Sequence, residues 1–142
     1  MKDELVRRAI EMARTAYAPY SRFGVGAAAL GGSGRIYAGC NVENASYPCG
    51  ICAERNAVFQ AVAAGERRIA AIAVAGGRDG VVSDYCAPCG ICRQTLREFA
   101  DPESCLVYLA KSEADVRVMT LAELLPASFG PESLGRPPAG MV

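Results

Sequence analysis

Two short cysteine-containing stretches constrain this chain more than any other part of its sequence. They are residues 48–55 (PCGICAER) and residues 87–94 (APCGICRQ). The thiols of Cys52, Cys89 and Cys92 could together bind one zinc ion, provided that the fold brings the two stretches side by side. Three protein ligands leave the fourth tetrahedral position open to water, which distinguishes a catalytic zinc site from a closed structural one.

A carboxylate, Glu54, follows the first of these ligands by two residues. The chain contains no histidine, so zinc must be held by cysteine or carboxylate groups and a general base must be something other than imidazole. We expect Glu54 to take a proton from a zinc-activated water and to deliver it elsewhere. We also expect Cys52, Cys89 and Cys92 in the first turns of two helices, where the helix dipoles lower thiol pKa values.

Neighbouring polar side chains could moderate the charge of such a site. Three thiolates on one Zn²⁺ leave a net charge of −1, which weakens the ion as a Lewis acid. Arg55 could donate a hydrogen bond to a ligand sulfur and so offset part of this charge, and Gln94 could act in the same way.

The same spacing also permits a different zinc site. Cys49 and Cys52 together with Cys89 and Cys92 would make the four ligands of a structural zinc ribbon without catalysis. The interval between the pairs is long for a ribbon, and a chain of this length does not need a metal to stabilise it. A ribbon also has no use for Glu54. Cys86 forms one more nominal pair with Cys89, so such spacings arise easily.

Length and composition indicate one globular domain over residues 1–130, followed by a Pro/Gly-rich tail, 131–142, whose last residues we expect to be mobile. Lys plus Arg and Asp plus Glu number 15 each, which argues against a nucleic-acid partner. No apolar run reaches the ~18 residues that cross a bilayer, so we expect no membrane association. Seven cysteines, an odd number, and no secretory signal favour a reducing, cytoplasmic setting.

The pattern of apolar residues predicts an α/β layered fold with a sheet of about five strands. Because βα units alternate, we expect the later strands to be parallel. Helices are expected over residues 2–17, 51–64, 89–99 and 120–125, and strands over 23–30, 35–40, 69–75, 105–110 and 115–118. The small residues in 25–29 imply close packing against at least one face of their strand.

Four sequence elements together resemble the small homotetrameric, three-cysteine cytidine deaminases. The core element is Cys-Ala-Glu at 52–54 with Pro-Cys-x-x-Cys at 88–92, which marks the wider superfamily of zinc-dependent deaminases. The other elements are 23–28 (FGVGAA), 41–44 (NVEN) and 124–130 (LLPASFG), of which 41–44 makes the resemblance specific. The resemblance covers roughly residues 5–130.

The resemblance implies roles for individual residues at a nucleoside site. Asn41 and Glu43 would hydrogen-bond the ribose at its 3′-hydroxyl, and Phe23 would pack against the pyrimidine ring. Ala53 would contact the base through its backbone, and Glu54 would act on N3.

It also implies an assembly. The family has a three-layer α-β-α sandwich with a mixed sheet, and its active sites lie at the subunit interfaces of a homotetramer. Ala45, Tyr47 and Phe129 resemble residues that reach the site from a neighbouring subunit. One Zn²⁺ per chain is expected. Two positions depart from the family pattern: Ala87 replaces a hydroxyl residue before the proline, and Cys49 adds an extra thiol.

The expected activity is the hydrolytic deamination of cytidine and deoxycytidine to uridine and deoxyuridine, with release of ammonia, as in pyrimidine salvage. An alternative within the same chemistry is a modified nucleoside such as blasticidin S, although Asn41 and Glu43 favour an ordinary ribose or deoxyribose. A deaminase of polynucleotides is disfavoured by the balanced charge, and a structural zinc module is the remaining alternative.

Overall fold

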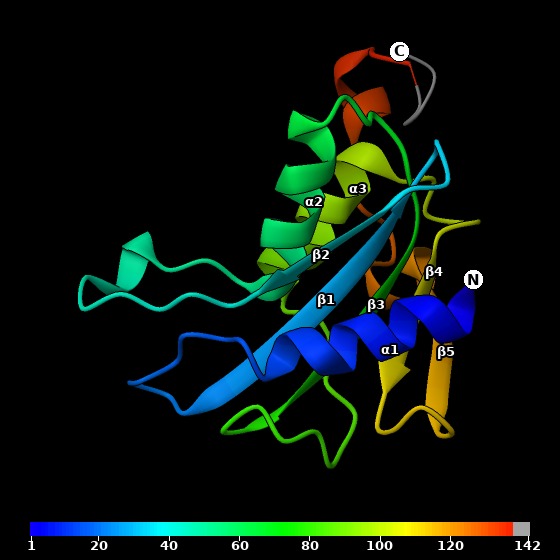
Figure 1. Cartoon of the computed structure of the whole chain (residues 1–142). Helices are drawn as coiled ribbons and strands as arrows, with labels where there is room; N and C mark the ends of the chain where they lie inside the picture. Colours follow the sequence, from blue (N-terminus) through cyan, green and yellow to red (C-terminus); the bar gives the residue numbers. More distant parts are fainter. Residues whose placement is uncertain (138–142) are drawn as a thin grey trace.

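The structure, a computed structural model, describes residues 1–137 (Figure 1). In chain order its elements are α1 (Lys2–Ala13), β1 (Phe23–Gly31), β2 (Ile36–Cys40), the 3₁₀ helix η1 (Tyr47–Cys49), α2 (Ala53–Ala63), β3 (Ile69–Arg78), α3 (Gly90–Phe99), β4 (Leu106–Ala110), β5 (Val116–Thr120), α4 (Leu121–Leu124) and the 3₁₀ helix η2 (Pro131–Leu134). Each expected helix and strand is found, with bounds that differ by a few residues.

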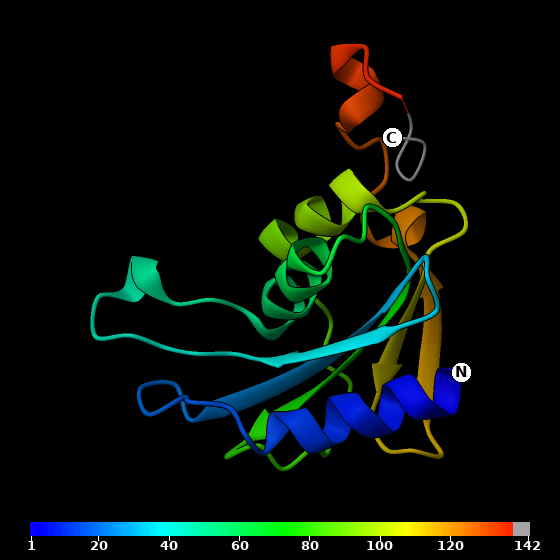
Figure 2. The ribbon, with the colours of Figure 1, turned by 45° about the horizontal axis from the view of Figure 1, so that its top comes forward.

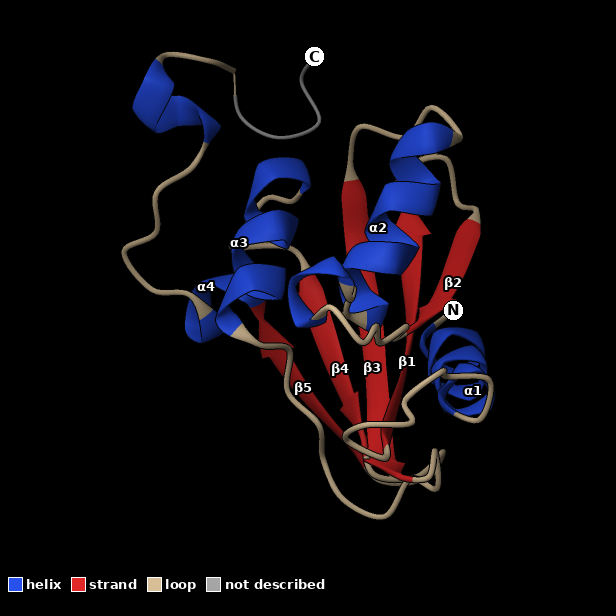
Figure 3. Cartoon of the chain, turned by 90° about the vertical axis from the view of Figure 1, so that its left-hand side faces the viewer, coloured by secondary structure: helices blue, strands red, loops and turns tan. Residues whose placement is uncertain are grey.

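The five strands form one mixed sheet in the order β2-β1-β3-β4-β5 (Figure 3). Only β3 and β4 are parallel, and the other three pairs are antiparallel. The expectation that the later strands are parallel is therefore wrong for β5. The reason is the length of the connections: α3 carries the chain from β3 to β4, whereas residues 111–115 between β4 and β5 allow only a hairpin.

Helices cover both faces of the sheet, which confirms the three-layer α-β-α architecture (Figure 2). α1 lies on one face, where Leu5, Val6 and Ala9 pack with apolar residues of the sheet. α2 and α3 lie on the other face, over a larger core that includes Val58, Leu96 and strand residues. Both helices that carry the cysteine stretches are therefore on the same side of the sheet.

Two glycines allow the helices to approach the sheet closely. A Cβ atom at Gly26 of β1 would lie 2.0 Å from the carbonyl oxygen of Ala9 in α1, and one at Gly39 of β2 would lie 2.7 Å from the backbone nitrogen of Ala57 in α2. Neither distance is sterically possible, so both positions require glycine. The close packing expected around residues 25–29 is thus present at Gly26, against α1, and Gly39 allows α2 a similarly close approach on the other face.

The first helix ends at Ala13, four residues before the expected end. Beyond it, Tyr17 forms a bridge with Val42: its N–H donates to the Asn41 carbonyl at 3.0 Å, and its carbonyl accepts the N–H of Glu43 at 2.8 Å. This tertiary pairing requires an extended backbone at Tyr17, so it ends the helix earlier than Pro19 would.

The start of the tail is ordered against the rest of the fold. Pro131, the first residue of η2, is buried, and Glu132 pairs with Arg97 of α3. The last residues of the tail, which we expect to be mobile, lie in part outside the described residues, since residue 137 is the last one described. Of the helices in residues 1–137, none is both long and apolar enough to span a lipid bilayer.

Candidate metal centre and active site

Three cysteine sulfurs meet where α2 and α3 begin. Cys52 is the residue before α2, Cys89 is the residue before α3, and Cys92 lies in the first turn of α3. The sulfur of Cys89 is 3.9 Å from that of Cys52 and 3.5 Å from that of Cys92, and all three lie within 4.8 Å of one another. The predicted ligand set is therefore assembled from two segments 37 residues apart.

The spacing of these sulfurs fits zinc. With Zn–S bonds of about 2.3 Å, tetrahedral geometry separates two ligand sulfurs by about 3.8 Å, and the two sulfur–sulfur distances from Cys89 bracket that value. Within residues 1–137 the cluster contains neither Cys49, which is exposed on η1, nor Cys86. The four-cysteine ribbon is not formed, and the three ligands leave one tetrahedral position for a non-protein ligand.

The surroundings shift the pKa values of Cys89 and Cys92 in opposite directions. Burial acts to raise the pKa of Cys89, but the backbone N–H groups of Cys92 and Ile91 and the neighbouring thiols outweigh it, so that its pKa is lowered. Burial raises the pKa of Cys92, and the charges of Glu54 and Cys52 add to the effect. Cys89, directly before the positive end of α3, therefore becomes a thiolate more readily than Cys92.

Glu54 is buried beside the cluster. It is the second residue of α2, and only 4% of its surface is exposed. Burial raises the pKa of its carboxyl, although its own backbone N–H, the Cys92 thiol and the charge of Arg55 act in the opposite direction. A carboxyl whose neutral form is favoured in this way can hold a proton near a reacting atom.

Arg55 contacts a ligand sulfur as expected. Its Nη2 donates to the sulfur of Cys52 at 3.7 Å, while its Nε is buried without a hydrogen-bond partner among the described residues. Gln94, for which the same role was expected, instead donates its side-chain amide to the carbonyl of Phe129 at 2.9 Å. Gln94 therefore holds the C-terminal segment rather than a ligand.

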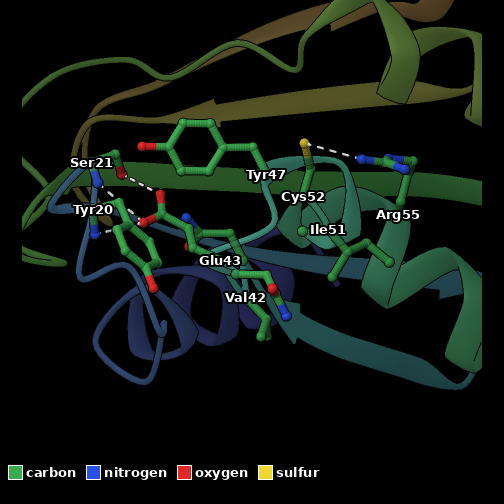
Figure 4. Close-up of a pocket in the computed structure, with 11 residues that line it drawn as sticks. Tyr20, Ser21, Val42, Glu43, Tyr47, Ile51, Cys52 and Arg55 are labelled. Atoms are coloured by element: carbon green, nitrogen blue, oxygen red, sulfur yellow. Dashed lines mark hydrogen bonds between the residues drawn. The ribbon is translucent and has the colours of Figure 1, made fainter.

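A hollow of about 510 Å³ opens beside Cys52 and Arg55 (Figure 4). Its walls come from the turn before β1, the loop between β2 and α2, and the start of α2. The residues that line it are Tyr20, Ser21, Asn41, Val42, Glu43, Asn44, Tyr47, Gly50, Ile51, Cys52 and Arg55. The loop is closed at its base by paired hydrogen bonds between Val42 and Ile51, at 3.1 and 3.0 Å. Beyond this pair it extends far from the sheet (Figures 1 and 2).

The two polar residues expected to read the ribose lie in this hollow and also hold the chain before β1. The carboxylate of Glu43 accepts the N–H groups of Tyr20 and Ser21, at 3.0 and 3.1 Å, and the Ser21 hydroxyl. These hydrogen bonds, above all that of the hydroxyl, lower the pKa of Glu43. The amide of Asn41 accepts the N–H of Val25 at 2.8 Å and donates to the carbonyl oxygen at position 23 at 2.9 Å.

Phe23 lies at the start of β1 and is not among the residues that line the hollow. Its ring packs close to Gly76, where an added Cβ would meet both the ring and the Cys86 sulfur at 3.1 Å. The pKa of Cys86 is raised to about 11 by burial, with smaller contributions from the charges of Glu54 and Cys52. The Cys86 sulfur and the Phe23 ring therefore both lie against Gly76 of β3.

The remaining expected residues occupy different surroundings. Ala53 is fully buried in the first turn of α2. Tyr47 is 76% exposed and packs edge-to-face against Tyr20 with ring centroids 6.0 Å apart. Ala45 is exposed in the same loop. Phe129 is 59% exposed on the segment after α4 and does not line the hollow of its own chain.

Tyr20, Ser21 and Arg93 were not predicted from the sequence. Tyr20 and Ser21 line the hollow through a turn that hydrogen bonds to the distant Glu43 hold in place, and no local pattern indicates such a partner. Arg93 donates to the carbonyl of Pro88 at 2.7 Å and to that of Leu124 at 2.7 Å, which ties the approach to Cys89 to the end of α4.

Comparisons with known proteins agree with this geometry. The family described as "Cytidine and deoxycytidylate deaminase zinc-binding region" matches residues 1–108. A cytidine deaminase of Sporosarcina psychrophila is 44% identical over 132 residues, 93% of each chain. One of Mycobacterium tuberculosis is 42% identical over 128 residues, 90% of this chain and 89% of the relative.

Solved structures show the same fold. The crystal structure of cytidine deaminase from Burkholderia pseudomallei has a TM-score of 0.81 and 45% identity, and the match covers 91% of this chain and 99% of that one. On the strength of the family match, the relatives and the three-sulfur cluster beside Glu54, this chain belongs to the cytidine and deoxycytidylate deaminase family.

Proposed function

We propose that this enzyme deaminates cytidine and deoxycytidine hydrolytically, giving uridine and deoxyuridine and releasing ammonia. One observation carries the proposal: a buried carboxylate, Glu54, adjoins three sulfurs that are spaced for zinc and leave one coordination position open. The cytidine deaminases among the relatives act on the substrate that this arrangement would suit.

Cys52, Cys89 and Cys92 would hold the zinc ion, which would supply a Lewis acid able to make water nucleophilic near neutral pH. Glu54 would receive one proton of the attacking water as the water oxygen bonds to C4, and it would pass that proton to N3 of the pyrimidine. When the amino group at C4 leaves, Glu54 carries the second proton to it, so that water and cytidine become uridine and ammonia. Burial raises the pKa of the Glu54 carboxyl, which makes its carboxylate a stronger acceptor for the first proton. Arg55, bonded to the sulfur of Cys52, offsets part of the negative charge of three thiolates.

Substrate recognition is proposed for the residues around the hollow. Asn41 and Glu43 keep free hydrogen-bonding capacity after their bonds to the chain before β1, since each carboxylate or amide oxygen can accept more than one hydrogen bond. This capacity suits the ribose 3′-hydroxyl. Phe23 would pack against the pyrimidine, and the backbone of Ala53 would contact the base.

We further propose that the enzyme is a homotetramer whose sites are completed by neighbouring subunits. Ala45, Tyr47 and Phe129 are exposed at the ends of projecting segments, where a second copy of the chain could receive them. The seven free cysteines suit a reducing compartment, which supports a location in the cytoplasm.

The decisive experiment follows the ultraviolet absorbance of cytidine with purified protein of known zinc content. Wild-type protein should convert the spectrum to that of uridine, and Glu54→Gln should not. If protein with one zinc per chain leaves cytidine unchanged but deaminates a modified nucleoside such as blasticidin S, the substrate assignment is wrong while the chemistry stands. If it deaminates neither, the proposal of a nucleoside deaminase is wrong.

A further inference from the structure

We propose that Arg22 and Asp79 form a positioning device that sets the placement of Phe23 against the substrate ring. Neither residue belongs to the site described above. The proposal rests on the proposed function in one respect, namely that Phe23 contacts the pyrimidine.

The first observation is an unusual backbone conformation at both positions. Within residues 1–137, only three residues other than glycine have positive φ values: Arg22 at 60°, Asp79 at 54° and Ala127 at 49°. This left-handed conformation costs free energy for residues with a side chain, and such residues persist only where their surroundings enforce them. Two of the three residues are direct partners of each other.

The second observation is the set of three hydrogen bonds between them. Nε and Nη2 of Arg22 donate to the two carboxylate oxygens of Asp79 at 3.0 and 3.2 Å, so the ion pair is bidentate. In addition, the backbone N–H of Asp79 donates to the carbonyl of Arg22 at 2.7 Å. A bidentate pair fixes orientation as well as distance.

The third observation is where this pair lies. In the β1–β3 ladder, Phe23 is aligned with Arg78 and the pairing ends there. Arg22 and Asp79 occupy the next position, so they connect the two strands just beyond the last residue pair of the ladder. A change in the Arg22–Asp79 pair should therefore change the backbone at the first residue of β1, which is the residue that carries the Phe23 ring.

The neighbouring hydrogen bonds hold the same short segment. The backbone N–H of Phe23 donates to the hydroxyl of Ser21 at 3.0 Å, and the carbonyl of Phe23 accepts the Asn41 amide. Glu43 holds Ser21 in turn. Asn41 and Glu43 thus hold the segment from the side of the hollow, while Asp79 holds it from the turn that follows β3.

Stability alone does not account for the pair. Both side chains are more than half exposed, at 59% and 52%, and exposed ion pairs contribute little to folding. A weak contribution joined to two unfavourable backbone conformations is typical of a segment whose geometry serves a ligand. The aromatic ring at the adjacent position is the side chain that this geometry places.

Two glycine substitutions separate the effect of losing the ion pair from the effect of losing the left-handed backbone conformation. Glycine adopts a positive φ without strain, so Arg22→Gly removes the ion pair and keeps the conformation accessible, as does Asp79→Gly. Because stacking of a base on an aromatic ring contributes to binding, partial misplacement of Phe23 should raise the KM for cytidine about fivefold in each variant, with kcat nearly unchanged. The matched control is Arg7→Ala, which removes the exposed ion pairs of Arg7 with Glu4 and Glu11 in α1 and should leave KM unchanged.

A double-mutant cycle distinguishes positioning from a general structural effect. Arg22→Gly should raise KM in the wild-type background but have no further effect once Phe23→Ala has removed the ring. Equal effects in both backgrounds, or an unchanged KM in Arg22→Gly, would overturn the positioning role while the proposed function stands. Wild-type protein without cytidine turnover, or Phe23→Ala with wild-type KM, would overturn the contact on which the proposal rests.

Discussion

Arg97 on α3 pairs with Glu132 on η2, Nη2 to Oε2, at 2.8 Å, and its Nε donates to the hydroxyl of Ser128 at the same distance. The side chain of Arg97 is nearly buried, and that of Glu132 is partly exposed. Because α3 also carries Cys92, one helix holds both a metal ligand and the segment that presents Phe129.

Loss of the Glu132 charge should loosen this segment. Glu132→Gln removes the charge partner of a buried guanidinium, which leaves Arg97 incompletely paired. We expect a lower melting temperature and faster cleavage of residues 126–134 in limited proteolysis, while the zinc content is unchanged. Glu11→Gln, which weakens an exposed ion pair on α1, is the control and should behave as wild type. A segment that stays as protected in Glu132→Gln as in wild type would show that the ion pair does not hold it.

Zinc binding should depend on some cysteines and not on others. Cys89→Ala removes a ligand whose sulfur lies 3.5 and 3.9 Å from the other two, so the purified variant should contain almost no zinc. Cys49→Ala changes a cysteine outside the cluster and should keep one zinc per chain. Metal analysis by mass spectrometry measures both. Zinc loss from Cys49→Ala as well would favour the four-cysteine site.

Glu54→Gln should separate catalysis from folding. The amide has nearly the same size but cannot carry the proton, so we expect kcat to fall by about 10²–10⁴-fold. Zinc content and melting temperature should stay close to those of wild type. Initial rates of cytidine loss, together with metal analysis of the same sample, measure the effect, and a variant of full activity would remove Glu54 from the mechanism.

Stability should depend on pH through Glu66, in the loop after α2. Hydrogen bonds from the Ser33 hydroxyl, from Tyr37 and from the Ser33 N–H lower the pKa of this carboxyl against the effect of burial. A carboxyl with a lowered folded pKa stabilises the protein above its unfolded pKa, about 4.3, and this contribution is lost as the pH falls through the folded pKa. Glu66→Gln should therefore melt below wild type at pH 7, and the difference should shrink below about pH 4. A difference that is the same at both pH values would contradict this assignment.

The contact between α1 and the sheet should be intolerant of one added methyl group. Gly26→Ala places a Cβ against the backbone of α1, and overpacking of this kind costs about 1–3 kcal/mol or more. Gly32→Ala is the control, since its Cβ would meet Arg68 only at ordinary contact distance, 3.4 Å. Urea unfolding of both variants measures the change, and equal stability would mean that α1 moves to accept the methyl group.

The sequence predicted best those features that depend on nearby residues or on the chemistry of residue types. The short helix α4 is found where it was expected, because its start depends on a capping box between Thr120 and Glu123, residues of a single turn. The set of Cys52, Cys89 and Cys92 could be predicted because few side chains bind zinc, and because Glu54 beside Cys52 favoured a catalytic site over a four-cysteine one.

Features that depend on distant partners could not be predicted in the same way. Gln94 was expected to donate to a ligand sulfur, but its actual partner lies 35 residues away on the segment after α4. α1 ends early because Tyr17 pairs with the loop after β2, which no local pattern indicates. The Arg22–Asp79 pair, 57 residues apart, likewise follows from the register of β1 against β3.

Two of the three zinc ligands, Cys52 and Cys89, stand immediately before the first residue of a helix. Helices are stiff, so a small rotation of α2 or α3 against the sheet changes the distance between these two sulfurs even when its cause lies at the far end of the helix. Zinc affinity is therefore a measure of how the core packs: a substitution at a buried position such as Ala61, in the last turn of α2 and far along the chain from Cys52, should weaken zinc binding in competition with a chelator.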